Sequence, residues 1–403
     1  MQSRILIILC IIISINYGSD YYLYSVLKNL YKDSSFYIGI KLFLIASVVI
    51  SSITYFGMFT SLLGGQGNRS ALVNLLIGFT FAYLIGKVAF IGLSVFTEII
   101  RAIEWGFNTE TGLPSRRKFL VNSSIILAGI PFISLIYGML RNKYNYKIYK
   151  QALTYSDLPE EFNGFKIVQI SDIHSGSFDN VAAIEKGIDL INEQQADVVL
   201  FTGDLVNDHP NEIDPYIETF KKIKAKHGVF STSGNHDYHY LSRNPQAQFS
   251  LLESKHEALG YKMLNNQHAR ISKNNQSVVI AGVENWGVPP FPQKGDLNKA
   301  FEGISENDFT ILMSHDPSHW DAQILNHTKQ VHLTLAGHTH GMQFGVELPG
   351  LKWSPVKYKY PRWAGLYEEG NQKLYVNRGF GFIGYPGRVG ILPEITVIEL
   401  KKG

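Results

Sequence analysis

The sequence has 403 residues, enough for more than one domain, and its formal net charge at pH 7 is only +3. Because no dense run of Lys and Arg dominates the second half, composition gives little support to nucleic-acid binding, and we expect no nucleic-acid partner. The only cysteine, Cys10, excludes a disulfide within one chain.

The first 140 residues are strongly apolar and predict helices that cross a membrane. The three longest apolar stretches cover residues 42–63, 72–96 and 121–140, and each is near or above the roughly 20 residues that a bilayer crossing requires. A fourth stretch, 5–15, is shorter, and its Tyr-rich continuation is interrupted by Asp20. We therefore predict a transmembrane helical region over residues 1–140 with three to four spans.

Lys87 lies well inside the stretch 72–96, where a charged ammonium group is costly. Such a residue snorkels to the membrane surface, pairs with another group or faces a polar cavity. The sequence leaves these alternatives open, including a functional role for Lys87.

After Leu140 the composition becomes that of a water-soluble α/β domain. We predict a polar connector at residues 141–160 and a domain at 161–403. Apolar runs alternate with amphipathic stretches, which favours a sheet packed with helices, with ligands at the carboxyl ends of the strands. Strands are predicted at 165–171, 197–203, 228–234, 277–284, 309–316, 331–338, 374–379 and 394–400, and helices at 181–193 and 216–226.

Side chains that can bind metal ions follow five of the six principal predicted strands. Singly, each also fits a structural role: an Asp can cap a turn, and a His beside an Asp can form an ion pair. Their repeated occurrence at strand ends instead indicates one shared metal site. The residues are Asp172, His174, Asp204, Asn235, His236, Asp237, His315, His338 and His340.

The predicted ligands are more numerous than a single ion normally takes, so two cations fit better than one. A carboxylate can bridge such a pair, and two ions roughly 3.5–4 Å apart can stabilise the attacking and leaving oxygens of a phosphoryl displacement. The sequence therefore predicts hydrolysis of a phosphate ester or anhydride.

Five motifs carry a resemblance to a known family: "SDIHSG", "GDLVND", "GNHD", a lone "SH" and "GHTHG", in this order. Together they resemble the signature of the calcineurin-like metallophosphoesterase superfamily over residues 165–400. The resemblance implies a fold of N-terminal transmembrane α-helices followed by an α/β domain, a metallophosphoesterase-type β-sandwich flanked by helices.

The same resemblance implies roles for individual residues. His236 would donate a proton to the phosphoryl or leaving-group oxygen, and Asp237 would hold its ring. The metals would be two divalent ions, either manganese, iron or zinc, since the mixed ligands suit each of these. One ion would be held by Asp172, His174, Asp204 and His340, and the other by Asp204, Asn235, His315 and His338.

The stretches "LPEEFNGFKIVQISDIHSG", "GHTHGMQ" and "NRGFGFIGYPGRVGILPE" resemble a membrane-associated bacterial branch, the YaeI/YkuE-like proteins. This resemblance places the Gly-rich final loop near the metals, where Arg388 could bind substrate phosphate, although Arg388 could equally be solvated. Two departures, Glu284 and Asp316, concern substrate detail. A long insert at 346–369, with Lys352, Lys357 and Arg362, fits either an ordinary loop or an aromatic and basic wall beside the site.

The side of the membrane follows from the basic residues near the predicted spans. "SRRKFL" at 115–120 resembles a twin-arginine export signal at an unusual internal position. If four helices span the membrane, seven basic residues lie on the face opposite the domain and six on the domain's own face, which favours an extracytoplasmic domain. The first set is Lys28, Lys32, Lys41, Arg101, Arg116, Arg117 and Lys118, and the second is Arg4, Arg69, Arg141, Lys143, Lys147 and Lys150.

We therefore expect a membrane-anchored, metal-dependent phosphohydrolase with a phosphorylated small-molecule or lipid-linked substrate and no obligate protein partner. Resemblance to enzymes that cleave UDP-2,3-diacylglucosamine in lipid A synthesis suggests a nucleotide- or sugar-linked lipid. The alternative is a non-enzymatic metal-binding sensor domain on a membrane anchor, against which His236 argues because binding alone needs no proton donor. A transporter with a regulatory domain would be supported by Lys87 alone.

Overall fold

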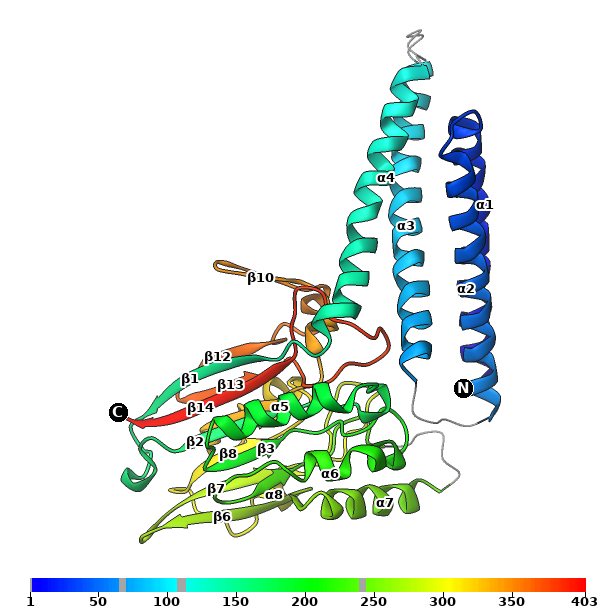
Figure 1. The fold of residues 1–403 in the computed structure, drawn as a ribbon. Coiled ribbons are helices and arrows are strands. Elements are labelled where there is room, and N and C mark those ends of the chain that lie inside the picture. Colours follow the sequence, from blue (N-terminus) through cyan, green and yellow to red (C-terminus); the bar gives the residue numbers. More distant parts are fainter. Residues whose placement is uncertain (1, 65–69, 107–113, 239–243) are drawn as a thin grey trace. The chain divides into compact units, whose positions relative to one another are not determined.

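The computed structural model describes residues 2–64, 70–106, 114–238 and 244–403. The chain separates into two compact units, a helical unit that extends to Leu140 and a sheet unit that begins at Arg141 (Figure 1).

Within the described residues, the helical unit contains four long helices. Segments of three of them, at Tyr37–Gly57, Ala71–Phe96 and Lys118–Asn142, are long and apolar enough to cross a bilayer, which confirms the three predicted spans. Many apolar side chains on these helices are exposed, as lipid-facing residues would be; Phe56 and Ile126 are both 70% exposed. The helices are α1 (Gln2–Tyr31), α2 (Tyr37–Gly64), α3 (Ala71–Gly106) and α4 (Pro114–Tyr137), which runs into a short π-helical turn at Gly138–Asn142.

Lys87 is buried between helices and pairs with a carboxylate. Its Nζ lies 2.8 Å from Oδ1 of Asp20 and 2.5 Å from Oδ1 of Asn16, and the Tyr83 hydroxyl donates to the same Asp20 oxygen at 2.8 Å. Pairing is one of the three alternatives that the sequence left open, and it joins α1 to α3. Asp20, which weakened the prediction of a fourth span, is therefore the partner of the Lys87 charge in the stretch 72–96.

The sheet unit is built on two six-stranded sheets and a separate two-stranded hairpin. The first sheet has the order β1 (Lys147–Tyr155), β14 (Glu394–Lys402), β2 (Lys166–Ile170), β3 (Val198–Phe201), β4 (Val229–Ser231), β5 (Tyr261–Met263). The second has the order β12 (Gly365–Glu369), β13 (Gln372–Val376), β9 (Leu333–Ala336), β8 (Phe309–Met313), β7 (Gln276–Gly282), β6 (Gln267–Lys273). The hairpin is β10 (Val346–Leu348) and β11 (Leu351–Trp353).

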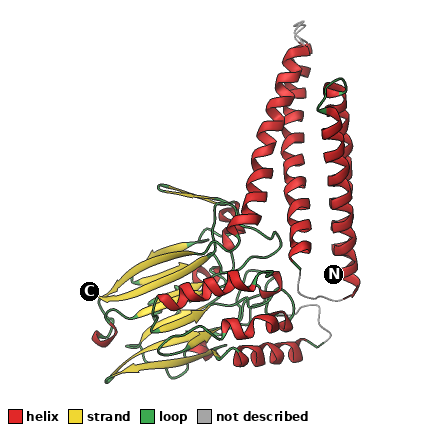
Figure 2. Cartoon of the chain, in the orientation of Figure 1, coloured by secondary structure: helices red, strands yellow, loops and turns green. Residues whose placement is uncertain are grey.

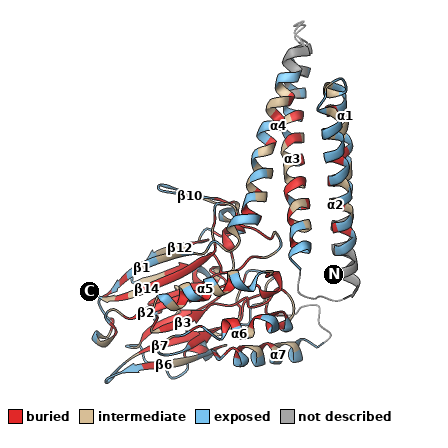
Figure 3. Cartoon of the chain, viewed as in Figure 1, coloured by how far each residue is buried: buried red, intermediate tan, exposed pale blue. Residues whose placement is uncertain are grey.

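Alternation along each strand divides its side chains between an inner and an outer layer. In β2, Ile167 joins the core between the two sheets, whereas Val168 and Ile170 join an outer core under the helices. Helices α5 (Val181–Glu193), α6 (Ile217–Phe220) and α7 (Pro245–Ala258) lie along the first sheet (Figure 2), and α8 (Leu297–Ala300) packs on the second. Central strands such as β3 and β8 are buried along their whole length, whereas edge strands such as β1 and β6 are partly exposed (Figure 3). The arrangement confirms the predicted α/β class.

Two sequence predictions differ from the fold. The predicted connector contains β1, which pairs in parallel with β14 along its whole length, so these residues are a sheet edge and not a linker. The predicted helix at 216–226 is helical only at Ile217–Phe220. Lys222 and Lys226 would lie one turn apart in a longer helix, where like charges repel.

Candidate metal centre

The predicted ligands come from loops at the carboxyl ends of five strands. Asp172 and His174 follow β2, Asp204 follows β3, and Asn235 follows β4. In the second sheet, His315 follows β8, and both His338 and His340 follow β9. These strands face one another across the inner core, so the two sheets deliver their loops to one edge of the sandwich.

Five of the seven predicted ligands have a positive φ, a conformation that side-chain-bearing residues rarely adopt. Each such residue costs on the order of 1–3 kcal/mol and persists only where surrounding structure imposes it, usually at functional sites. The residues are Asp172 (54°), His174 (51°), Asp204 (59°), His338 (70°) and His340 (51°). The backbone is thus strained to bring these side chains together.

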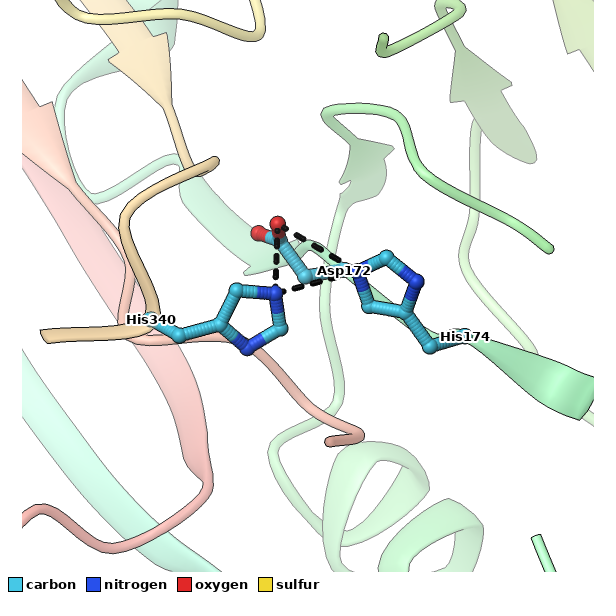
Figure 4. Close-up of side chains that lie close together, drawn as sticks. All are labelled: Asp172, His174 and His340. Carbon is cyan, nitrogen blue, oxygen red and sulfur yellow. Dashed lines mark hydrogen bonds and ion pairs between the residues drawn. The ribbon is translucent and has the colours of Figure 1, made fainter. Parts of the chain in front are cut away.

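Asp172, His174 and His340 form one buried group (Figure 4). Nε2 of His340 lies 3.1 Å from Oδ1 of Asp172 and 3.0 Å from Nε2 of His174. The close approach needs Gly337, since a Cβ there would lie 2.3 Å from Oδ2 of Asp172.

Asp204, His315 and His338 form a second group. Nε2 of His315 lies 3.1 Å from Oδ2 of Asp204, and the same oxygen lies 3.6 Å from Nε2 of His174 in the first group. Nδ1 of His338 lies 2.6 Å from Oδ1 of Asn235, which adds an amide oxygen to the second group. Asp204 is therefore positioned between the groups, where the resemblance expected a bridging ligand.

The chemistry of these side chains requires a positive charge. His315 donates its Nδ1–H to the Thr202 carbonyl at 2.7 Å, so in the neutral ring Nε2 carries a lone pair that faces the Asp204 carboxylate. Burial lowers the pKa of His315, but Asp204 and Asp172 outweigh this effect and raise it to about 10. A proton or a metal cation must occupy this position, and the ligand types fit divalent manganese, iron or zinc at both groups.

His236 lines the pocket beside both groups, and its ring is oriented by a backbone carbonyl. Its Nδ1 donates to the Asn207 carbonyl at 2.7 Å, which leaves Nε2 to hold or release a proton. The expectation that Asp237 holds this ring is therefore wrong.

Asp237 instead binds the backbone around the ligand loops. Its two carboxylate oxygens accept N–H groups of Asp204 at 2.9 Å, Leu205 at 2.9 Å and Gly234 at 2.8 Å. The reason is local. Short acidic side chains commonly accept hydrogen bonds from nearby backbone N–H groups, as Asp237 does from Gly234 three residues earlier. Its role is to position Asp204.

Comparisons with known proteins agree with this geometry. The profile described as "Calcineurin-like phosphoesterase" matches residues 165–342, and the profile described as "Probable Calcineurin-like phosphoesterase, transmembrane domain" matches residues 3–143. The uncharacterized metallophosphoesterase YkuE of Bacillus subtilis (strain 168) is 30% identical over 294 residues, which cover 71% of this chain and 98% of YkuE.

Two further relatives are also described as proteins with a metallophosphoesterase domain or as metallophosphoesterases. The "Transmembrane protein with metallophosphoesterase domain" of Danio rerio is 28% identical over 281 residues, 68% of this chain, and the match spans 61% of that protein's length. An uncharacterized metallophosphoesterase of Helicobacter pylori (strain J99 / ATCC 700824) is 27% identical over 366 residues, which cover 87% of this chain and 90% of the relative.

The chain belongs to the calcineurin-like metallophosphoesterase family. It is a membrane-anchored metallophosphoesterase with candidate sites for divalent ions.

Arg388 of this metallophosphoesterase is not a substrate ligand in the structure. It is fully buried, and its guanidinium donates to the carbonyls of Gly379 at 3.1 Å and Gly381 at 2.5 Å. Nη2 also lies 3.3 Å from Nδ1 of His340. The Gly-rich loop lies beside His340 of the first ligand group, but the Arg388 side chain points into this loop and holds its carbonyls together.

The insert at 346–369 contributes directly to the metallophosphoesterase site, which the sequence left open. The Tyr360 hydroxyl lies 2.7 Å from Nε2 of His338, whose other nitrogen belongs to the second metal group. Tyr360 and Lys359 line a pocket of about 210 Å³ at the metal groups, together with Phe291, Val356 and Ile383.

Two residues with positioning roles were missed from the sequence. For Tyr360, the only signal in the sequence was its place in the aromatic insert at 346–369. Glu212 is buried and accepts the backbone N–H groups of Asn207 at 2.6 Å and His209 at 3.1 Å, so it fixes the carbonyl that orients His236. The spacing of His209 and Glu212 is that of a helix-capping box, which was the available signal.

The two departures from the family pattern lie near the site. Asp316 has Oδ2 at 3.5 Å from Nε2 of His338, so it faces the same nitrogen as Tyr360. Glu284 accepts hydrogen bonds from Tyr238 at 2.7 Å and Asn266 at 3.0 Å. Asp316 is therefore a neighbour of the candidate ligand His338, whereas Glu284 holds loop residues together.

Proposed function

We propose that this metallophosphoesterase hydrolyses a phosphoester or pyrophosphate bond at two divalent ions and that the phosphate belongs to a lipid-linked substrate. The two ions would be held by Asp172, His174, Asp204 and His340, and by Asp204, Asn235, His315 and His338. They would supply Lewis-acid stabilisation of the phosphoryl oxygens. The observation that carries the proposal is the placement of Asp204 between the two ligand groups, with His236 at the same pocket.

His236 is proposed as the proton donor. Because the Asn207 carbonyl holds Nδ1–H, the proton that can move is the one on Nε2. It would pass to the leaving-group oxygen, and the ring would recover a proton from solvent.

The pocket walls support an amphipathic substrate. Phe291, Val356 and Ile383 supply apolar surface to the pocket that the ligand groups line, and the exposed ammonium of Lys359 lies 5.2 Å from the Phe291 ring centroid. A phosphate with an apolar or aromatic neighbour fits such a pocket, and Lys359 would pair with a second phosphate of a pyrophosphate. UDP-2,3-diacylglucosamine and other nucleotide- or sugar-linked lipids are the first substrates to test.

The test uses the purified full chain in lipid nanodiscs with added manganese, iron or zinc. Turnover of a phosphomonoester, a chromogenic phosphodiester and a lipid pyrophosphate is measured alongside metal content. We expect hydrolysis by the wild type and loss of both turnover and metal in Asp204→Asn, because an amide bridges two cations less well than a carboxylate. Two bound ions with no turnover of any substrate would favour the sensor alternative.

We further propose that the sheet unit lies outside the cytoplasm. The support is the count of basic residues near the spans and the arginine pair Arg116 and Arg117, which lies in the first turn of α4. Added protease should degrade the chain beyond Gln151 in intact spheroplasts while a cytoplasmic marker survives. Replacement of both arginines by Lys should trap the domain inside, since that export route recognises the guanidinium pair.

A further inference from the structure

The β10–β11 hairpin has one polar and one apolar face. Its register pairs Val346 with Trp353, Glu347 with Lys352, and Leu348 with Leu351. Because side chains of directly paired residues lie on the same side of an antiparallel sheet and alternate along each strand, one face carries four apolar residues. The other carries Glu347 and Lys352.

The polar face holds the hairpin on the sheet unit. Glu347 accepts the Tyr149 hydroxyl at 3.0 Å through Oε2, and its other oxygen pairs with Arg378. Lys352 donates to the Ala364 carbonyl, with its Nζ 4.9 Å from the Trp363 ring centroid. The orientation of the hairpin is therefore fixed by its polar residues.

The apolar face is left exposed as a result. Leu348 is 62% exposed, Leu351 is 53% exposed and Val346 is 38% exposed, and they flank the Pro-Gly turn of a hairpin that extends away from the two sheets (Figures 1 and 3). A soluble hairpin ordinarily buries this face and exposes the charged one. This hairpin leaves its apolar face in solvent while its charged pair contacts the sheet unit, which marks the apolar face as an interaction surface.

Residues beside the hairpin have the character of a membrane interface. The turn Pro355–Tyr358 carries Tyr358, which is 78% exposed, and the neighbouring side chains Lys357 and Lys359 are exposed. An exposed Tyr with flanking Lys is typical of the headgroup region, where the ring is partly buried and the ammonium contacts phosphate.

The chain itself keeps this surface near a bilayer. The third membrane-spanning segment ends at Asn142, and Tyr149, which binds the hairpin through Glu347, lies seven residues later. Seven residues reach at most about 25 Å when fully extended. The bilayer is therefore the one partner that is always within reach of the hairpin.

We propose that the hairpin surface, formed by Val346, Leu348, Leu351 and Tyr358 with Lys357 at its edge, inserts into the headgroup region of the anionic bilayer that anchors the chain. Val356, Lys359 and Tyr360 follow the hairpin directly and line the metal pocket. Insertion of the hairpin thus holds the pocket mouth at the membrane surface. The inference concerns binding to lipid and stands apart from the identity of the substrate.

The test measures the surroundings of Leu348 in the full chain. Cys10→Ser removes the native thiol, Leu348→Cys introduces a labelling site, and an environment-sensitive fluorophore is attached. Single chains are placed in nanodiscs of phosphatidylcholine and phosphatidylglycerol. We expect the probe to be quenched by lipids with a nitroxide near the headgroup and protected from aqueous iodide.

Asn275→Cys provides the matched control. Asn275 is exposed in the turn between the antiparallel strands β6 and β7, at the edge of the second sheet. Its probe should be quenched by iodide and not by the lipid nitroxide. If the Leu348 probe behaves like the Asn275 probe, the proposal is overturned. Protection of the Leu348 probe from both quenchers would also overturn it, because that result indicates a protein contact.

A functional arm uses Leu348→Asp with Leu351→Asp. We expect KM for a lipid substrate in the same nanodisc to rise several-fold while kcat for a soluble phosphodiester is unchanged. An unchanged KM for the lipid, with soluble turnover intact, would contradict the proposed role. If the wild type does not hydrolyse the soluble phosphodiester, that result counts against the proposed hydrolase activity. The quenching result remains a valid test of hairpin insertion.

Discussion

The carboxylate of Asp237 accepts the backbone N–H of Asp204 at 2.9 Å, and Asp204 has a φ of 59°. The hydrogen bond stabilises a backbone conformation that costs on the order of 1–3 kcal/mol when unsupported. Asp237 therefore determines where the proposed bridging carboxylate lies, although it belongs to neither ligand group.

Asp237→Asn should weaken metal binding and activity by roughly 10–100-fold, the usual cost of losing a partner behind a metal ligand. An amide presents only one oxygen to N–H groups that now bind both carboxylate oxygens. Metal content and turnover of the variant give the measurement. Asp208→Asn changes an acidic residue four positions after Asp204 that makes none of these contacts, and it serves as the control. Equal loss in both variants would argue against the role.

His236→Ala should slow turnover by roughly 10²–10⁴-fold while metal content stays near that of the wild type. The ring bonds to the Asn207 carbonyl, so its loss removes a proton donor and leaves the two ligand groups in place. Comparison of leaving groups separates two roles. Rescue by very acidic leaving groups supports proton donation, and an equal loss with all leaving groups points to charge stabilisation.

Tyr360→Phe removes the hydroxyl that lies 2.7 Å from Nε2 of His338. We expect a roughly 10–100-fold loss of metal affinity or activity, confined to the ion that His338 binds. Metal titration should show one weakened site and one unchanged site. Tyr358→Phe changes an exposed hydroxyl two residues earlier and should leave the soluble activity intact; a loss in that variant would indicate a general effect of the loop.

Lys87→Met should destabilise the helical unit, because the buried carboxylate of Asp20 then lacks its partner. Breaking a buried pair from one side costs roughly 3–5 kcal/mol, whereas removal of both charges is often nearly neutral. Thermal unfolding in detergent should therefore show a large loss for the single variant and recovery when Asp20→Asn is added. Absence of recovery would contradict pairing as the role of Lys87.

Acid should weaken the sheet unit through His256, whose pKa burial lowers to about 3. An unfolded His binds a proton near pH 6.5, so between these values only the unfolded state is protonated and stability falls as pH falls, by about 1.4 kcal/mol per unit. The loss is absent above about pH 6.5. Thermal unfolding at pH 7 and pH 5 should show a smaller pH effect in His256→Gln, and an identical effect would exclude this origin.

Local sequence was sufficient for the strands at the centre of the two sheets, the three spans and the clustering of ligands at strand ends, but not for edge strands such as β1 and β6. Alternation of apolar residues and long apolar runs reflect burial, which depends on each segment alone. The five motifs placed Asp172, Asp204 and His338 at strand ends because a strand is followed at once by the loop that carries its ligand. Membership of the metallophosphoesterase family could be recognised from the same motifs.

Tertiary structure decided which partner each side chain contacts. Asp237 binds the Asp204 loop instead of His236, Arg388 is buried behind His340, and Tyr360 reaches His338 from an insert 22 residues along the chain. Lys87 pairs with Asp20 of α1, which lies 67 residues earlier in the chain. Such contacts join residues far apart in sequence, and hydrogen-bond geometry depends on distances of a few tenths of an ångström that only the packed fold fixes.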